Sequence, residues 1–311
     1  MYNLLTVARQ VAALFVLMGF GAVLRRMRLV GDATIDGFVN VLILVVTPCV
    51  IIDVFQRPFD DSALASLGMA FLVAVLVHVA AILLAKLCIR HSDENVRRPL
   101  LLAAVFSNAG FMGIPLEQAI LGDVGVFFGV VYVVVFNLFI WSWGVKEMKA
   151  GECRSSGDLC KMLLNPGTVG IAIGLPLFLL SAHLPSFVSI PVHQMANMNT
   201  PLAMVVIGYG LAGAKLGAVL RSPAVYIASF VRLLACPLLL IAAFYPFRAY
   251  LDRDMMLALT VAASAPVAAM VSMFASKFRR DVDTGVAVIS GTTLLSILTM
   301  PVVIAIAMEV L

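Results

Sequence analysis

Long apolar runs separated by short polar breaks make up most of the chain. A helix needs about 20 apolar residues to cross a bilayer core of roughly 30 Å. By this rule the sequence predicts ten spans, near residues 5–25, 35–55, 64–89, 98–120, 124–145, 163–182, 194–215, 222–247, 255–277 and 284–309. The longest hydrophilic stretch, residues 146–161, lies in the middle, and it divides the spans into two sets of five.

The two halves resemble each other in the placement of small and proline residues. Gly21 and Gly174 occupy equivalent places 153 residues apart, and the same offset relates Thr47-Pro48 to Thr200-Pro201. Because each half has an odd number of spans, the second copy must enter the membrane upside down. Inverted repeats of this kind are typical of secondary transporters, which bind their substrate at the midplane between the two copies.

These patterns predict an all-α integral membrane fold of ten transmembrane helices in two inverted five-helix repeats. The first repeat is expected at residues 1–150, a cytoplasmic linker at 151–162 and the second repeat at 163–311.

Composition and charge support the same class. Only 12% of the 311 residues are charged and 62% are apolar, whereas soluble domains carry about 25% charged residues. A soluble enzyme and a nucleic-acid-binding protein are therefore excluded. When alternate loops are assigned to one side, 16 of the 21 Lys and Arg residues fall on that side, which is expected to be cytoplasmic. Both termini are then expected outside.

Spans 4 and 9 are interrupted in their middles. Span 4 carries Gly110, Gly113 and Pro115, and span 9 carries Pro266. Glycine weakens a helix and proline removes a backbone hydrogen bond. Membranes tolerate such breaks only where the freed backbone is buried in protein or lines a cavity. Two broken helices at matching positions indicate a transporter's binding site, although each could also be an ordinary proline kink.

If the two spans cross, the half-helices beyond the breaks direct N–H groups and positive dipole ends toward the centre, which favours an anion. Asn108 adds two donors and one acceptor without a charge, which suits a carboxylate that must also leave. Alternatively, Asn108 forms an interhelical hydrogen bond. The expected substrate-binding residues are Asn108, Ala109, Gly110, Pro115, Ala265, Pro266 and Val267.

Three further residues are candidates for a charge or proton role. Arg232 lies in the middle of span 8, where it could neutralise a carboxylate, bind the carbonyls of the crossing or snorkel to the cytoplasmic side. His78 lies at nearly the equivalent place in span 3 and is either titratable or simply packed. Glu117 follows the break in span 4. We expect it near the outer end, either as an ordinary solvated carboxylate or as a proton or cation carrier.

Motifs for chemistry or cofactors are missing from the sequence. Gly208–Gly213 fits the GxGxxG pattern, but it follows no strand and reads as small residues that let helices approach closely. No catalytic residue, metal site or cofactor is expected, and the protein is not expected to be an enzyme.

The segment from Ser107 to Leu116 resembles the span-4 signature of the auxin efflux carrier family. Leu164 to Gly167, Arg232 to Pro237 and Thr293 to Pro301 match the family as well, so the resemblance covers the whole chain. Ala109 departs from the pattern, since threonine is frequent at that position.

This resemblance implies a fold similar to that of bile-acid symporters. Spans 1, 2, 6 and 7 would form a scaffold, spans 3–5 and 8–10 a moving core, and spans 4 and 9 would cross. It also implies an organic anion as substrate, with Asn108 contacting the carboxylate and Pro115 and Pro266 shaping the crossing. A homodimer in the bacterial inner membrane is expected. The coupling ion, a proton or sodium, stays open.

The leading hypothesis is therefore a secondary transporter that moves a small organic anion by alternating access. A cation/proton antiporter on the same fold is an alternative, but it needs a carboxylate at the core centre, and the sequence places none there. A second alternative is a membrane sensor or scaffold that does not transport.

Overall fold

The computed structural model describes residues 4–57, 61–149, 166–213 and 223–311, and no strand occurs among them. The first part contains α1 (Leu4–Arg26), α2 (Asp32–Val41), η1 (Leu42–Val46), α3 (Thr47–Phe55), α4 (Asp61–Cys88), α5 (Glu94–Val105), η2 (Ala109–Gly113), α6 (Ile114–Leu121), α7 (Asp123–Phe139), η3 (Ile140–Gly144) and α8 (Val145–Lys149). The second part contains α10 (Pro166–Leu179), α11 (Ser186–Asn197), α12 (Asn199–Ala212), α14 (Pro223–Phe230), η4 (Val231–Ala235), α15 (Cys236–Phe244), η5 (Tyr245–Phe247), α16 (Arg253–Ser264), α17 (Met270–Lys277) and α18 (Val282–Val310). The linker predicted at 151–162 lies outside these residues.

The helices carry apolar surfaces that suit a bilayer. In the described part of the chain, five helical stretches are long and apolar enough to cross a membrane: Asp32–Phe55, Leu64–Cys88, Asp123–Lys149, Pro223–Phe247 and Val282–Val310. On α4, Leu72, Leu76, Leu83 and Leu87 are between 52% and 66% exposed along one face. Exposure of such an apolar face is unfavourable in water, whereas contact with lipid chains is favourable. The prediction of an all-helical membrane protein is confirmed, and the ten-span inverted repeat stays a prediction.

Three π-helical turns precede prolines. Pro48, Pro115 and Pro237 each lie two residues after the end of η1, η2 and η4, respectively. A proline has no N–H for the carbonyl one turn earlier, and its ring clashes with that carbonyl. The wider π turn relieves this clash and lets the helix continue.

Small residues bring two pairs of helices into close contact. Gly208 of α12 lies against the backbone of Met18 on α1, and Gly21 of α1 lies against Val205, so a side chain on either glycine would overlap the neighbouring backbone. Gly174 of α10 likewise packs on Phe55 of α3. In each pair a helix of one half therefore packs on a helix of the other half.

The helix α11 differs from expectation, since most of it lies between the predicted spans at 163–182 and 194–215. It begins after Pro185 and packs on α3, and none of its residues is buried. The sequence does not reveal it because a helix lying on the surface of other helices needs no continuous apolar run.

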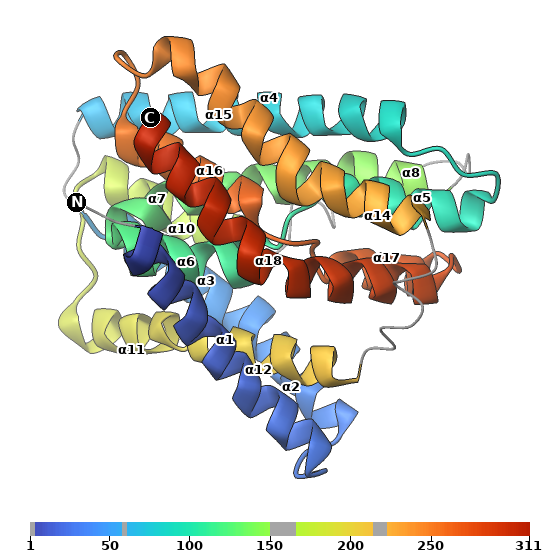
Figure 1. Cartoon of the computed structure of the whole chain (residues 1–311). Coiled ribbons are helices and arrows are strands. Elements are labelled where there is room, and N and C mark those ends of the chain that lie inside the picture. Colours follow the sequence, from blue (N-terminus) through green and yellow to red (C-terminus); the bar gives the residue numbers. More distant parts are fainter. Residues whose placement is uncertain (1–3, 58–60, 150–165, 214–222) are drawn as a thin grey trace.

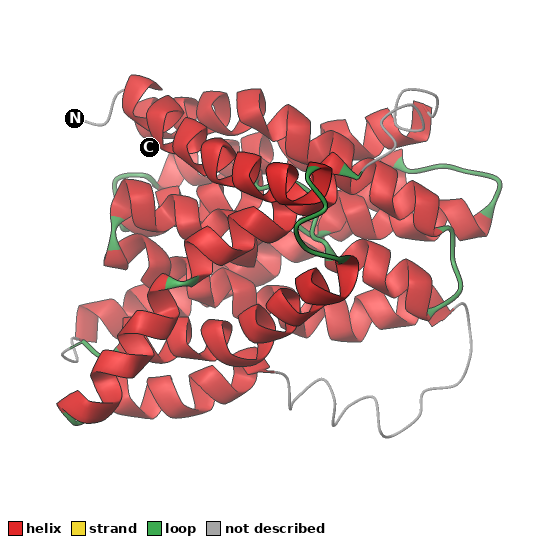
Figure 2. Cartoon of the chain, turned by 90° about the horizontal axis from the view of Figure 1, so that it is seen from below, coloured by secondary structure: helices red, strands yellow, loops and turns green. Residues whose placement is uncertain are grey.

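Two groups of helices surround the interior. Figure 1 shows α1, α2, α11 and α12 along the lower side and α4, α14 and α15 along the upper side. Helix α7 packs against α4, α6 and α16, and most of its residues are buried. The view from below in Figure 2 shows that helices make up nearly all of the described chain.

Candidate functional site

Two interrupted helices meet inside the bundle. The chain leaves the helical conformation between α5 and η2 and again between α16 and α17. At these points Ser107 and Val267 form an antiparallel bridge. The Asn108 N–H donates to the Pro266 carbonyl over 2.6 Å, and the Ala268 N–H donates to the Phe106 carbonyl over 3.0 Å. We call residues 106–110 and 265–269 the crossing.

Local sequence explains the break in α16. The residue before a proline avoids the helical region, and Ala265 before Pro266 is extended, at φ −62° and ψ 148°. In the other segment of the crossing, the backbone of Phe106 is also extended, at φ −99° and ψ 111°. Each break frees backbone groups that the membrane interior cannot solvate. The two segments satisfy some of these groups by bonding to each other.

Arg232, on η4, forms hydrogen bonds to both segments of chain that lead into the crossing. Its side chain is 0% exposed. Nη1 donates to the Val105 carbonyl over 2.6 Å, and Nη2 donates to the Ala263 carbonyl. These carbonyls lie at the C-terminal ends of α5 and α16, where the helix dipole favours a cation. Snorkelling of Arg232 to the cytoplasmic side, one of three interpretations of the sequence, is wrong for this reason.

Most of the expected substrate-binding residues come together at the crossing. Asn108, Ala109 and Gly110 lie on one segment of the crossing, and Ala265, Pro266 and Val267 lie on the other. The Asn108 side chain is 8% exposed and has no hydrogen-bond partner among the described residues. Space next to Gly110 is open, since nothing lies within 4 Å of an added Cβ there. Pro115 lies further along, in the first turn of α6.

The two helical segments that leave the crossing direct their N-termini toward it. η2 begins at Ala109 and α17 begins at Met270. The first N–H groups of a helix have no acceptor within the helix, and they carry partial positive charge. The buried amide side chain of Asn108 and two such ends form a neutral donor set that suits a carboxylate.

Sequence reasoning missed two side chains at the crossing. Thr292 of α18 accepts a hydrogen bond from the Val267 N–H over 3.2 Å and donates to the Val288 carbonyl over 2.7 Å. The Ser107 hydroxyl is buried and has no partner among the described residues. Polar residues in the middle of an apolar span were the available signal, but only the fold shows that they meet at the crossing.

His78 is packed among aromatic rings. Its ring centroid lies 4.9 Å from Tyr132, 5.2 Å from Phe139 and 6.2 Å from Phe106. Nδ1 lies 2.8 Å from the Ala74 carbonyl, and the side chain is 1% exposed. The contact with Phe106 links His78 to the crossing through an apolar ring, so its position fits a packing role better than a charge role.

Glu117 lies deeper than the sequence predicts. Of the two interpretations of the sequence, the solvated carboxylate is wrong, because the residue is 0% exposed, whereas the proton or cation carrier stays a prediction. Its side chain lies over Gly129 of α7, where a Cβ would overlap the carboxylate. Neither carboxyl oxygen has a hydrogen-bond partner in the described residues. The expectation fails because α7 supplies a glycine at the point where α6 packs on it.

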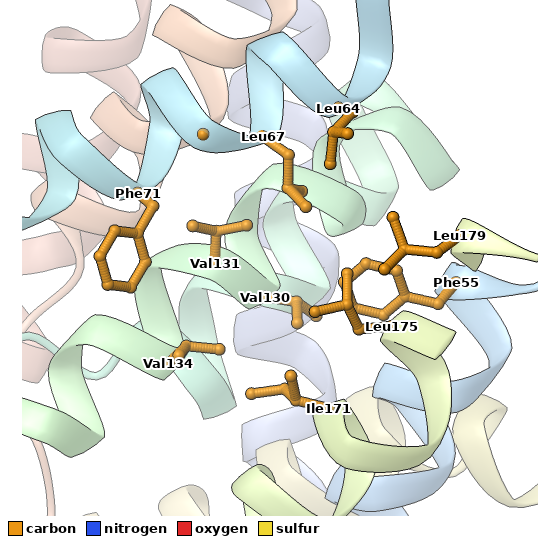
Figure 3. A pocket seen from close by; sticks show the side chains of 11 residues that line it. Phe55, Leu64, Leu67, Phe71, Val130, Val131, Val134, Ile171, Leu175 and Leu179 are labelled. Carbon is orange, nitrogen blue, oxygen red and sulfur yellow. The ribbon is translucent and has the colours of Figure 1, made fainter. Parts of the chain in front are cut away.

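A groove of about 320 Å³ opens elsewhere, between α3, α4, α7 and α10. Figure 3 shows its apolar walls, including Phe55, Phe71, Val131 and Leu175. Its lining contains no polar side chain. A carboxylate placed there would lose its hydration without compensation, so this groove is not the anion site.

Charged residues cluster at the start of α5. Arg97 donates to Glu94 over 2.7 Å, and Arg98 forms an ion pair with Glu94 at 2.8 Å and with Glu147 at 3.6 Å. The hydrogen bond from Arg97 holds the pKa of the Glu94 carboxyl below its usual value. Arg280 donates to the Met148 carbonyl over 2.8 Å, so the cluster ties α5, α8 and the start of α18 together. Among the described residues, no group of three or more His, Cys, Asp or Glu side chains could hold a metal ion.

Comparison with known proteins identifies a family. A family model described as a membrane transport protein matches residues 6–304, nearly the whole chain. No curated protein matches the chain. The matched range includes both segments of the crossing as well as Arg232 and Glu117.

Proposed function

Since the chain belongs to the auxin efflux carrier family of membrane transport proteins, we propose that it moves a small organic anion across the membrane by alternating access. Membership of the family makes the protein a membrane transporter. The proposal adds the substrate class, a carboxylate, and the type of mechanism, secondary transport by a moving core.

The observation that carries the proposal is the crossing itself. Two interrupted helices form backbone hydrogen bonds with each other in the protein interior. Arg232 donates to backbone carbonyls at the C-terminal ends of α5 and α16. The opposite side of each break presents N–H groups, and the buried Asn108 amide has no hydrogen-bond partner among the described residues. A carboxylate at this place would accept hydrogen bonds from Asn108 and from the N-terminus of η2.

Packing supports a division into a scaffold and a moving core. Helices α1 and α12 pack closely on each other, as do α3 and α10, and these are the proposed scaffold spans. The proposed core helices α5, α7, α16 and α18 likewise contact one another around the crossing. We infer that the core carries the anion past the scaffold in an elevator-type or rocking motion. A homodimer in the inner membrane with both termini outside completes the proposal.

One observation favours the antiporter alternative. The sequence places no carboxylate at the centre of the core, but in the structure Glu117 is fully buried beside Gly113 of η2. A cation/proton antiporter would bind its cation at such a carboxylate. Transport of sodium or potassium against protons, without any organic anion, would favour this alternative.

Uptake into liposomes tests the proposed function. Purified protein is reconstituted and offered radiolabelled malonate, malate and indole-3-acetate, with protein-free liposomes as the control. We expect saturable accumulation of at least one acid above the control. Binding of an acid without accumulation would favour a sensor, and neither binding nor accumulation would contradict the proposed substrate class.

A further inference from the structure

Glu117 is a fully buried acid in a notch made of two glycines. Its side chain is 0% exposed. The carboxylate contacts the position that a side chain on Gly129 of α7 would occupy, and Oε1 lies 3.6 Å from the Cβ position of Gly113. Larger residues at 113 and 129 would fill this space, so the two glycines make room for the acid.

No counter-charge reaches the carboxyl group. Helix α6 packs against α7, η2, α16, α1 and α12. Their charged or titratable residues are Asp123, Tyr132, Arg253, Asp254, Arg9, Arg25, Arg26 and Tyr209. None of these donates to Glu117 or forms an ion pair with it, since both carboxyl oxygens lack a partner in the described part of the chain.

An ionised carboxylate in this position would be buried without a cation or a hydrogen-bond donor. That state is strongly disfavoured, whereas the neutral acid is tolerated in apolar surroundings. Glu117 therefore holds a proton in this conformation. A residue that only filled the space between α6 and α7 could be apolar. The presence of a carboxyl group at position 117 therefore needs another explanation.

We propose that Glu117 is a proton-binding site of the transport core and that its proton crosses the membrane together with the substrate anion. This inference rests on the proposed function and adds the coupling ion. The proton comes from water on the loading side, forms an O–H bond to the Glu117 carboxylate, and returns to water on the other side. No other bond changes.

Charge balance in the core supports coupled movement. Arg232 is the fully buried cation among the described residues. With a monocarboxylate bound and Glu117 protonated, the core has no net charge. With the anion released and the Glu117 proton returned to water, the charges of Arg232 and Glu117 sum to zero, although the two side chains form no ion pair in this conformation. Either neutral state crosses an apolar barrier more easily than a core with one surplus charge.

Infrared spectroscopy tests the proton site without any substrate. Purified protein at pH 7 is compared before and after exchange into deuterated buffer, and the C=O stretch of a protonated carboxylic acid is measured. We expect this band in the wild type and in Glu309→Gln, whose substituted side chain is exposed on α18, but not in Glu117→Gln. Absence of the band from the wild type, or its persistence in Glu117→Gln, would overturn the proton site.

Transport assays test the coupling. Liposomes with an inward proton gradient are offered radiolabelled malonate, malate or indole-3-acetate, and the pH inside is followed with a dye. In the wild type and Glu309→Gln, the gradient should drive accumulation at least tenfold faster than in its absence, with proton entry. Glu117→Gln should lose this acceleration while still exchanging internal for external acid, because exchange requires only the loaded core.

The two proposals fail in different ways. If the wild type moves none of the acids while the infrared band is present, the proposed function fails and the proton site remains. If the wild type moves an acid and Glu117→Gln responds equally to the proton gradient, or if a sodium gradient alone drives uptake, the proposed function remains and proton coupling through Glu117 is overturned.

Discussion

The backbone N–H of Asn108 donates a hydrogen bond of 2.6 Å to the carbonyl of Pro266, and this bond joins two helices that are each interrupted in the middle. It places an unpartnered amide side chain directly beside a helix break in the protein interior. Backbone groups that leave one helix are thus satisfied by the other, so the site stays ordered without losing its free donors.

Replacement of Arg232 by lysine should disrupt the crossing. Lysine keeps the charge but lacks the planar fork that reaches two carbonyls. We expect a loss of about 1–3 kcal/mol, typical of hydrogen bonds from a charged donor, and at least a tenfold loss of uptake. Thermal unfolding in detergent and acid uptake measure the two effects.

Arg253→Lys is the matched control for that variant. Arg253 also donates to a backbone carbonyl, that of Met308, over 2.8 Å, but the bond is exposed. It should change stability by less than about 1 kcal/mol. Equal effects of the two substitutions would contradict the role assigned to Arg232.

A methyl group at Gly129 should collide with Glu117. Gly129→Ala overfills the contact between α6 and α7, and overpacking of this kind costs about 1–3 kcal/mol. Gly19→Ala on α1 meets nothing within 4 Å and should leave the unfolding temperature nearly unchanged. Shortening Glu117 to alanine in the Gly129→Ala background should recover part of the loss. If stability is not recovered, the contact between Glu117 and position 129 is contradicted.

Two glycines on α12 offer a direct test of the packing on α1. Gly208→Ala would place a methyl group against the backbone of Met18, whereas Gly210→Ala meets nothing within 4 Å. The first variant should lower stability by about 1–3 kcal/mol, and the second should be neutral or slightly stabilising because alanine favours the helix. Thermal unfolding of the two variants side by side makes the comparison, and similar melting temperatures would contradict the close approach of these helices.

The charged cluster on α5 should respond to acid. The pKa of Glu94 is lowered in the folded state, so its stabilising effect is present above the ordinary carboxyl pKa and disappears as the pH falls through the lowered value. Glu94→Gln should cost less than about 1 kcal/mol at pH 7, because the group is largely exposed. The difference from the wild type should vanish in acid. Unfolding temperatures across a pH series measure this, and a difference that grows in acid would contradict the sign.

Sequence alone predicts the interruptions well, because proline and glycine act on the residues next to them. Pro266 ends a helix wherever that helix lies, and Asn108 stands two residues before Gly110. The apolar runs likewise predict helices that cross a membrane, since the bilayer fixes their length.

The partners of buried polar side chains could not be predicted in the same way. Arg232 bonds to carbonyls 127 and 31 residues away, and both are freed by helix breaks that only the assembled fold brings together. For Glu117, the sequence shows a carboxylate near a helix end, whereas its burial depends on Gly129, which lies on another helix. Which residues of different helices contact each other depends on tertiary packing, and this cannot be read from a single sequence.

Exchange of a labelled acid across the membrane tests the central claim, that the crossing binds the substrate anion. Liposomes are loaded with the unlabelled acid that the wild-type protein accumulates, and entry of the radiolabelled acid is measured for the wild type, Asn108→Ala and Asn197→Ala, the last being an exposed position on α11. All three proteins should unfold at similar temperatures. We predict that Asn108→Ala reduces exchange at least tenfold while Asn197→Ala exchanges like the wild type. Exchange by Asn108→Ala at the wild-type rate would contradict the assignment of the crossing as the substrate site.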